Sequence, residues 1–254
     1  MADAIIQPRR SKGAPRLGPA AVLAATGPDL RRLRDRLGFG ADPGRPLHIG
    51  RLYTASESLP GLSLAGPMVG APYAVMVAEA LIAWGSRRLI FLGWCGSIVE
   101  QVAIGDLVLA TSAFIDEGTS RHYLPDPCRS AASPALARII SDGCAAGGIR
   151  IHAGAVWTTD APYRETPDQV LDYRRRGALA VEMEVSALYS VAAFRRVEAA
   201  ALLVVSDDLS SLRWAPGFND PRFALGREAA ADIIGRICSM PAAGPAPPAA
   251  VIRA

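Results

Sequence analysis

The sequence has few cysteines, no long apolar run and little net charge, and each of these shortages argues against one class of protein. Its four cysteines, at positions 95, 128, 144 and 238, form no CxxC pair, so neither a disulfide framework nor a zinc site is expected. No segment offers about eighteen uninterrupted apolar residues, and the N-terminus lacks the apolar core of a secretion signal. Acids number 24 against 27 bases, with both signs interspersed, which gives no reason to expect a nucleic acid or a membrane as partner. We therefore expect a cytoplasmic protein with reduced thiols.

The chain is long enough for one large domain. Of its 254 residues, 50% are hydrophobic and 20% are charged, so a sizeable core can be buried. Residues 1–18 mix Arg, Lys, Pro and Gly, and residues 241–254 are low-complexity Pro and Ala, which is typical of tails that lack regular structure. The sequence predicts a disordered N-terminal tail over residues 1–18, one domain over residues 19–240 and a Pro/Ala-rich C-terminal tail over residues 241–254.

Short apolar runs alternate with amphipathic segments along the predicted domain. The predicted strands cover residues 20–25, 62–66, 88–93, 106–115, 151–159, 178–184 and 197–206. The predicted helices cover residues 29–37, 72–84, 133–146, 167–176, 185–194 and about 221–238. Several strands are apolar on both faces, so helices should cover both sides of the sheet. The expected fold is α/β, a single three-layer αβα sandwich around a central mixed sheet.

Acidic residues follow two of the predicted strands at the point where each strand ends. Glu182 and Glu184 are two residues apart, so they share one face of their strand. The next strand closes with Asp207 and Asp208. Burying such carboxylates costs several kcal/mol unless they are hydrogen-bonded, so solvated strand ends are the simpler alternative. Because ligands collect beyond the carboxyl ends of strands in α/β sheets, two neighbouring strands with acidic ends favour a polar pocket.

Glycine-containing turns follow two other predicted strands. The turn at residues 26–29 leads into a helix that carries Arg31, and it offers an anion backbone N–H groups, a positive helix end and a guanidinium. A capped surface helix is an equally good interpretation. The turn at residues 93–96 lets the backbone approach a ligand or a neighbouring helix. Within it, Cys95 could be a nucleophile with His122 as its base, although a structural role is commoner for such a cysteine and nothing in the sequence places the two together.

The chain resembles the nucleoside phosphorylase-I superfamily, which includes purine nucleoside phosphorylases, uridine phosphorylases and related nucleoside hydrolases. The resemblance spans about residues 20–237 and implies the fold of the purine and uridine phosphorylases. It rests on the turn from Gly27 to Arg31, Gly66-Pro67-Met68-Val69-Gly70-Ala71-Pro72, Gly93-Trp94-Cys95-Gly96, Gly105-Asp106-Leu107-Val108, Asp160-Ala161-Pro162-Tyr163, Val181-Glu182-Met183-Glu184 and Ser206-Asp207. The last two motifs, at this separation, are specific to the family, whereas each glycine motif alone is not.

The resemblance implies that Glu184 and Asp207 are the catalytic residues. It implies that Glu184 binds the ribose 2′ and 3′ hydroxyls beside Glu182 and Met183, where a carboxylate compensates the positive charge of a ribosyl cation-like transition state. It also implies that Asp207 protonates N7 of a departing purine, with a pKa raised by burial. A purine is therefore the favoured base, although residues 117–123 look more like the matching stretch of uridine phosphorylases.

The resemblance further implies a base site and a phosphate site. The base site comprises Trp94, Cys95, Gly96, Tyr163 and Asp207. Relatives often have Phe at the position of Pro162, so this position offers no aromatic ring to stack on the base. The phosphate site comprises Gly27, Arg31 and Arg51, and Arg51 or His48 would reach it from a neighbouring subunit.

The sequence departs from the phosphorylase pattern where phosphate should bind. Phosphorylases have Arg and Ser or Thr at the positions held here by Phe91 and Trp94. Each lost charge-assisted hydrogen bond removes roughly 1.5–3 kcal/mol. Phosphorolysis remains the favoured reaction, because the phosphorylase-like spacing of Gly27 and Arg31 is hard to explain if no anion binds. The alternatives are a nucleosidase of the same fold, with water as nucleophile, and a non-catalytic protein that binds nucleosides or nucleotides.

The resemblance also carries expectations about cofactors, assembly and metabolic role. A pentosyltransferase of this kind uses inorganic phosphate as co-substrate and needs no metal and no organic cofactor. It acts in nucleoside metabolism and purine salvage in the cytoplasm. We expect a homo-oligomer, either a dimer or a hexamer, that binds small molecules only.

Overall fold

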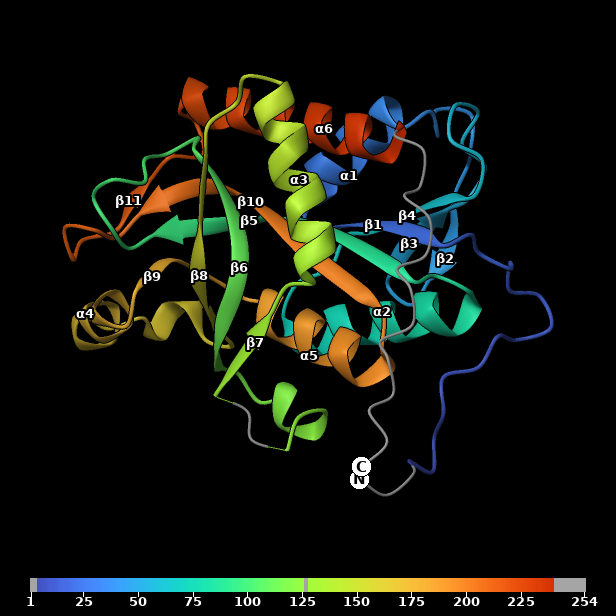
Figure 1. Cartoon of the computed structure of the whole chain (residues 1–254), viewed down its shortest axis with the longest axis horizontal. Helices are drawn as coiled ribbons and strands as arrows, with labels where there is room; N and C mark the ends of the chain where they lie inside the picture. The colour runs from blue at the N-terminus through green and yellow to red at the C-terminus, as the bar shows by residue number, and fades with distance from the viewer. Residues whose placement is uncertain (1–3, 126–127, 240–254) are drawn as a thin grey trace, which may run out of the picture.

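The computed structural model describes residues 4–125 and 128–239, and it contains a mixed β-sheet with helices on both faces (Figure 1). The strands are β1 (Ala20–Ala24), β2 (Arg45–Leu47), β3 (Gly50–Tyr53), β4 (Leu62–Gly66), β5 (Arg88–Ser97), β6 (Leu107–Asp116), β7 (Arg129–Ala131), β8 (Ile151–Thr159), β9 (Ala178–Glu182), β10 (Glu198–Asp208) and β11 (Ala215–Pro216). The helices are α1 (Gly27–Arg36), α2 (Ala71–Trp84), α3 (Pro134–Ala146), α4 (Pro167–Arg175), α5 (Val185–Arg195) and α6 (Pro221–Ser239), with short 3-10 helices η1 (Ser120–His122) and η2 (Pro162–Arg164).

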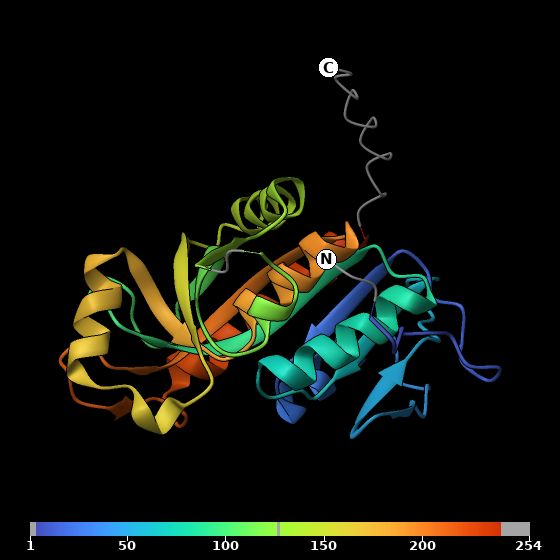
Figure 2. The ribbon, with the colours of Figure 1, turned by 90° about the horizontal axis from the view of Figure 1, so that it is seen from below.

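The helices form two layers that enclose the sheet. Helices α1, α3 and α6 cover one face, where α6 contacts both of the others (Figure 1). Helices α2 and α5 lie side by side on the other face (Figure 2). Strands β5 and β10 run between these layers and are buried along most of their length. The three-layer αβα sandwich with a mixed sheet that the sequence predicts is thus confirmed.

The sheet runs in the order β11-β10-β6-β8-β9-β5-β1-β4-β3-β2, and β10 pairs with β5 as well. Strand β5 is parallel to β1 and β10 and antiparallel to β9. The pairings from β5 through β10, β6, β8 and β9 therefore close on β5 again. As a result, β5 has β10 on one side and β9 on the other near its carboxyl end.

The predicted strands and helices are all present, with bounds that shift by a few residues. The largest difference is β5, which continues to Ser97 and so includes the glycine turn. The sequence analysis missed β2, β3, β7 and β11, which are 3, 4, 3 and 2 residues long. Strands this short do not repeat the two-residue alternation of apolar and polar residues often enough to be recognised.

Local capping explains why two of the helices begin where they do. The Thr26 side chain accepts the Asp29 backbone N–H at 3.3 Å at the start of α1. Thr166 and Gln169 form a reciprocal capping box at the start of α4. Helix α1 is thereby held directly after β1, and α4 directly after the segment that follows β8. Both helix starts border the pockets described below.

The segment that precedes β1 packs against the domain at two positions. Ala14 and Leu17 are buried, and the Leu17 N–H donates to the Trp84 carbonyl at 2.9 Å. The C-terminal tail predicted for residues 241–254 lies outside the described residues. The division into two tails and one domain stays a prediction. Within the described ranges, no helix is long and apolar enough to cross a membrane.

Candidate active site

The ends of β5, β9 and β10 meet at one place. Asp207 lies opposite Gly96 on β5, after a register shift that leaves Ser206 as an extra residue. Val181 of β9 lies opposite Gly96 from the other side. Strand β5 therefore separates the two acidic strands in the described sheet, and the expectation that they are direct neighbours is wrong. The bulge matters because an extra residue re-aims the side chain that follows it, here Asp207.

A pocket of about 450 Å³ lies where these strands end, which is within the size range of small-molecule sites. The residues expected in the base site all line it, as do two of those expected near the ribose, namely Trp94, Cys95, Gly96, Tyr163, Asp207, Glu182 and Met183. The other lining residues are Pro162, Glu165, Val181, Ser206, Leu209, Trp214 and Phe218. We call this cavity the base pocket.

The Asp207 carboxylate is held by two hydrogen bonds. Its Oδ1 accepts the Ser206 hydroxyl at 2.6 Å and its Oδ2 accepts the Trp214 indole N–H at 3.0 Å. Gly96 leaves room for this carboxylate, since a Cβ at that position would come within 3.0 Å of Asp207 Oδ2. The carboxylate therefore has a defined orientation at the wall of the base pocket.

The aromatic side chains that line the base pocket are Trp94 and Tyr163, which the resemblance implied, together with Trp214 and Phe218, which it did not. The Phe218 ring lies 6.1 Å from the Trp94 ring and 6.3 Å from the Trp214 ring, measured between centroids. Tyr163 belongs to the lining, yet its side chain is 99% exposed. Flat surfaces for a planar base are thus offered by Trp94 and Phe218, rather than by the segment around Pro162.

Glu182 and Glu184 are both buried, and each is held by backbone N–H groups. Glu182 Oε2 accepts the N–H groups of Glu184 and Val185 at 2.6 and 2.7 Å, and Oε1 accepts the Thr158 hydroxyl. Glu184 Oε1 accepts the Gly70 N–H at 2.5 Å. Burial raises the pKa of Glu182 to about 7. Burial and then the charge of Glu182 raise the pKa of Glu184 to about 8.

These raised pKa values predict that the protein loses stability as the pH rises. The folded state keeps protons on Glu182 and Glu184 that the unfolded chain releases above its ordinary value of 4.5, so the free energy of unfolding falls between about pH 5 and about pH 8. Glu184→Gln removes one titrating group and should weaken this dependence, whereas Glu57→Gln, at an exposed position, should not. Urea denaturation at about pH 5.5 and about pH 8.5 measures the difference. An unchanged pH dependence in Glu184→Gln would show that Glu184 is ionised throughout.

A second pocket contains the residues expected to bind phosphate. Gly27, Arg31 and Arg51 line it together with His48 and Pro67, and we call it the anion pocket. The Arg31 guanidinium lies over Gly27, with 3.6 Å between its Nη1 and the point that a Cβ would occupy. In the described part of the chain, this guanidinium has no hydrogen-bond or ion-pair partner. Arg51 and His48 border the anion pocket of their own chain, and their contribution to the site of a neighbouring subunit stays a prediction.

The anion pocket and the base pocket are connected by the residues expected to hold the sugar. Pro67 lines the anion pocket, and Gly70, three residues on, is hydrogen-bonded to Glu184. Met183 precedes Glu184 and lines the base pocket. Glu184 itself is not among the residues that line either pocket, because its carboxyl group is buried against the 66–70 loop. The loop that borders the anion pocket thus contacts Glu184, whose neighbour in the chain, Met183, lines the base pocket.

The residues that replace the expected phosphate ligands take part in other interactions. Phe91 is buried in the core at 2% exposure. Its ring lies so close to Gly93 that a Cβ at that position would come within 2.6 Å of it. The Trp94 indole donates to the buried carboxylate of Asp29 at 2.5 Å. Asp29 also accepts Arg32 at 3.0 Å and Arg227 at 2.7 Å. A protein carboxylate therefore neutralises cationic side chains close to the start of α1.

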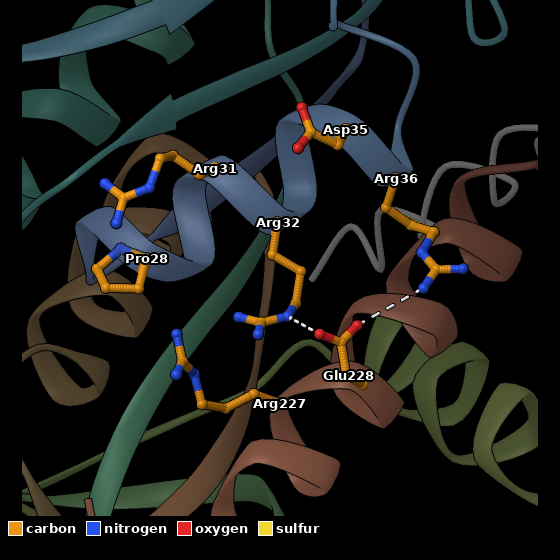
Figure 3. A pocket seen from close by; sticks show the side chains of 7 residues that line it. All are labelled: Pro28, Arg31, Arg32, Asp35, Arg36, Arg227 and Glu228. Atoms are coloured by element: carbon orange, nitrogen blue, oxygen red, sulfur yellow. Dashed lines mark hydrogen bonds and ion pairs between the residues drawn. The ribbon is translucent and has the colours of Figure 1, made fainter.

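The arginines of α1 divide into a paired set and a free one. Arg32 and Arg36 both reach Glu228 on α6, whereas Arg31 points away from it (Figure 3). Arg36 also pairs with Asp232 at 2.7 Å. Of these α1 arginines, Arg31 is thus the one whose charge remains available to a ligand.

The structure separates Cys95 from the base suggested for it. Cys95 lines the base pocket, whereas His122 lines a different cleft beside α2 and α5. Burial, followed by the charges of Asp207 and Glu182, raises the pKa of the Cys95 thiol well above its ordinary value. A neutral thiol is a poor nucleophile, so the structure gives no support to a Cys95 and His122 pair.

The sequence analysis did not single out several residues of the site. Glu165, Trp214 and Phe218 lie in irregular segments without a strand or helix period, so no pattern marks them. Asp29 was considered as part of a turn, but its partner Arg227 is distant in the sequence. A contact between residues so far apart leaves no local signal.

Comparisons with known proteins identify the family. The pattern of the phosphorylase superfamily matches residues 19–237. The chain therefore belongs to the phosphorylase superfamily.

Among characterised relatives, the DeoD-type purine nucleoside phosphorylases of Bacillus cytotoxicus and Bacillus mycoides are each 35% identical over 150 residues. The matched stretch covers 58% of this chain and 64% of each relative, so it spans less than two-thirds of the length of these enzymes.

Solved structures share the fold. A purine nucleoside phosphorylase of Toxoplasma gondii in complex with immucillin-H has a TM-score of 0.77 at 19% identity, with 94% of this chain and 97% of that chain covered. A uridine phosphorylase of Vibrio fischeri has a TM-score of 0.76 at 20% identity, covering 91% and 96%. An AMP nucleosidase of Bacteroides thetaiotaomicron has a TM-score of 0.67 at 25% identity, covering 87% and 90%.

Proposed function

We propose that this protein is a nucleoside phosphorylase that cleaves the N-glycosidic bond of a purine nucleoside with phosphate, releasing the free base and a pentose 1-phosphate. The observation that carries the proposal is the unpaired Arg31 over Gly27 in the anion pocket. A guanidinium beside the backbone of Gly27 at a helix start is suited to a phosphate dianion. The name of the DeoD-type relatives supports the same reaction and a purine base.

In this proposal, Glu184 binds the 2′ and 3′ hydroxyls of a ribose that lies between the two pockets. The bond to the base breaks while positive charge develops on the ribose, and a fixed carboxylate beside the ring stabilises that charge. The hydrogen bond from the Gly70 N–H positions the Glu184 carboxyl group. The developing cation favours the ionised form of Glu184, so its pKa should fall as the transition state is reached.

Asp207 serves the departing base. A purine that leaves with its bonding electrons must be protonated, and N7 is the atom that a carboxyl group in the base pocket can reach. The Ser206 and Trp214 hydrogen bonds restrict Asp207 to one orientation, which is what a proton transfer of defined geometry requires. Trp94 and Phe218 supply the flat surfaces that would contact the purine ring.

A nucleosidase is the second candidate, and the substituted phosphate ligands favour it. Phe91 offers no polar group, and the Trp94 indole is bonded to Asp29. A phosphate in the anion pocket would therefore depend on Arg31, Arg51 and the Gly27 backbone. If those contacts are too few to hold phosphate, water from solvent attacks the same ribosyl centre.

A nucleoside panel assayed with and without phosphate tests the proposal. We expect base release from inosine or adenosine to require phosphate and to exceed release from uridine. Asp207→Asn should slow the purine nucleosides more than uridine, because only purines need protonation at N7. Full activity in phosphate-free buffer would establish the nucleosidase instead. Binding of nucleosides without any cleavage would establish a non-catalytic binding protein.

The assembly and the cofactor requirement complete the proposal. We propose a cytoplasmic homo-oligomer, a dimer or a hexamer, that uses phosphate as co-substrate and no metal or organic cofactor. Arg51 and His48 already border the anion pocket of their own chain. A neighbouring subunit would therefore cover this pocket and need not complete it.

A further inference from the structure

The base pocket contains a second carboxyl group that the proposed reaction does not yet use. Glu165 follows η2 and precedes α4, is partly buried, and lines the base pocket together with Asp207. Within residues 4–125 and 128–239, its carboxyl group has no hydrogen-bond or ion-pair partner. Asp207 differs, since both of its oxygens accept hydrogen bonds. Hydrogen bonds thus hold the Asp207 carboxyl group in one orientation, whereas none among the described residues holds the Glu165 carboxyl group.

The titratable groups that line the base pocket with Glu165 are all acidic or neutral, and the adjacent Arg164 is exposed and is not part of this lining. The described lining of the base pocket contains Asp207 from β10, Glu182 from β9, Cys95 from β5 and Tyr163 from η2, and it contains no Arg, Lys or His. Burial and then the charge of Asp207 raise the pKa of Glu165 to about 7. The nearby charge of Asp207 thus disfavours ionisation of Glu165, so Glu165 keeps its proton up to about neutral pH.

The hydrogen bonds indicate which of the two carries that proton. An indole N–H can only donate, so Asp207 Oδ2 must accept from Trp214. The Ser206 hydroxyl has two acceptors within reach, Asp207 Oδ1 at 2.6 Å and the Cys95 carbonyl oxygen at 3.3 Å, and the shorter contact is the one to Asp207. Both contacts suit an ionised Asp207. Glu165, which has no such donors around it, is the member that suits the protonated state.

We propose that Glu165 and Asp207 form a carboxyl pair and that Glu165 is the source of the proton taken up by the departing purine. This inference rests on the proposed function and deepens it. As the bond between C1′ and N9 breaks, its electron pair goes to the purine, an oxygen of phosphate bonds to C1′, and the proton passes from the carboxyl pair to N7. Glu165 is left as a carboxylate beside Asp207, and the pair regains a proton from water after the base has left.

Two substrates that differ in their need for a proton test this role. Inosine needs protonation at N7, whereas N7-methylated inosine already carries a positive charge and leaves without a proton. We expect Glu165→Gln to lower kcat/KM for inosine by about 10- to 100-fold and for the methylated nucleoside by less than about threefold. With inosine, wild-type activity should fall above about pH 7 through ionisation of Glu165, and the variant should lack this decline.

The control is Glu100→Gln, which changes an exposed glutamate at the turn after β5 and should leave both substrates unaffected. An equal loss on both substrates would assign Glu165 a structural role and overturn the inference. Unchanged activity on inosine would overturn it as well.

A titration without substrate separates this inference from the proposed function. In protein labelled with carboxyl-¹³C glutamate, the Glu165 resonance is the one that disappears in Glu165→Gln. We expect it to titrate near pH 7 and to move to lower pH in Asp207→Asn, because the neighbouring charge is removed. Titration near the ordinary value for glutamate would overturn the carboxyl pair. If the wild-type protein cleaves no nucleoside, the proposed function and the catalytic role of Glu165 both fail, and the titration still decides whether the pair exists.

Discussion

Replacing Glu184 with alanine is expected to lower kcat/KM for a purine ribonucleoside by about 30- to 160-fold, which corresponds to about 2–3 kcal/mol of transition-state stabilisation. The physical reason is that a buried carboxylate beside the sugar stabilises positive charge that exists only during bond cleavage. The loss should therefore appear in kcat and not only in KM. Steady-state kinetics with varied nucleoside at saturating phosphate measures both parameters.

A 2′-deoxynucleoside distinguishes lost sugar contacts from general damage. If Glu184 binds the 2′ hydroxyl, wild-type protein should prefer the ribonucleoside, and Glu184→Ala should reduce that preference. Because Glu184 accepts the Gly70 N–H, the alanine variant also loosens the 66–70 loop. Glu184→Gln keeps an oxygen that can accept this bond and serves as the second variant. Near-normal turnover in both variants would remove Glu184 from the catalytic residues.

Replacing Arg31 with alanine is expected to raise the KM for phosphate by about 10- to 160-fold, since a charge-assisted hydrogen bond contributes roughly 1.5–3 kcal/mol. The KM for the nucleoside should change little, because the base pocket and the anion pocket have separate linings. Initial rates measured over a wide range of phosphate concentrations test this expectation.

Arg36→Ala is the matched control for Arg31→Ala. Both residues lie on α1, but Arg36 pairs with Glu228 and Asp232 on α6, so its removal should leave the phosphate dependence unchanged. Equal effects of the two substitutions would mean that loss of positive charge on α1, and not a contact with phosphate, is responsible. A phosphate requirement that survives intact in Arg31→Ala would remove this residue from the anion site.

The electrostatics around α1 explain why Arg31 has so large an expected role. Asp29 is 1% exposed and accepts hydrogen bonds from Arg32, Arg227 and Trp94. Its negative charge offsets the two arginines and would repel a phosphate placed against them. An incoming anion therefore depends on guanidinium groups that Asp29 does not contact, and Arg31 is one of these.

The fold was predictable because its long elements carry strong local signals. Strands such as β10 have continuous buried apolar runs, and helices such as α3 begin with a Ser-Pro pair that marks their first turn. The short strands β2, β3, β7 and β11 were missed because tertiary pairing, rather than their own short sequences, holds them in place. The position of β5 between β9 and β10 was also missed. Strand β9 pairs antiparallel with β5 only because the sheet closes on itself, and the sequence of β9 does not indicate that pairing.

The expected site residues were recognisable because acids at the ends of apolar strands stand out against their surroundings. Glu182, Glu184 and Asp207 were found in this way, Gly27 and Arg31 were found from the turn after the first strand, and the family resemblance assigned a role to each. The sequence alone thus determines the layers of the fold and which strand ends carry acidic side chains, since both follow from local runs of apolar and polar residues. The tertiary structure alone decides that Trp94 bonds to Asp29, that Arg31 has no partner among the described residues and that Glu165 shares a pocket with Asp207. These arrangements depend on residues that are distant in the chain. Their charges influence one another only after folding removes the water between them.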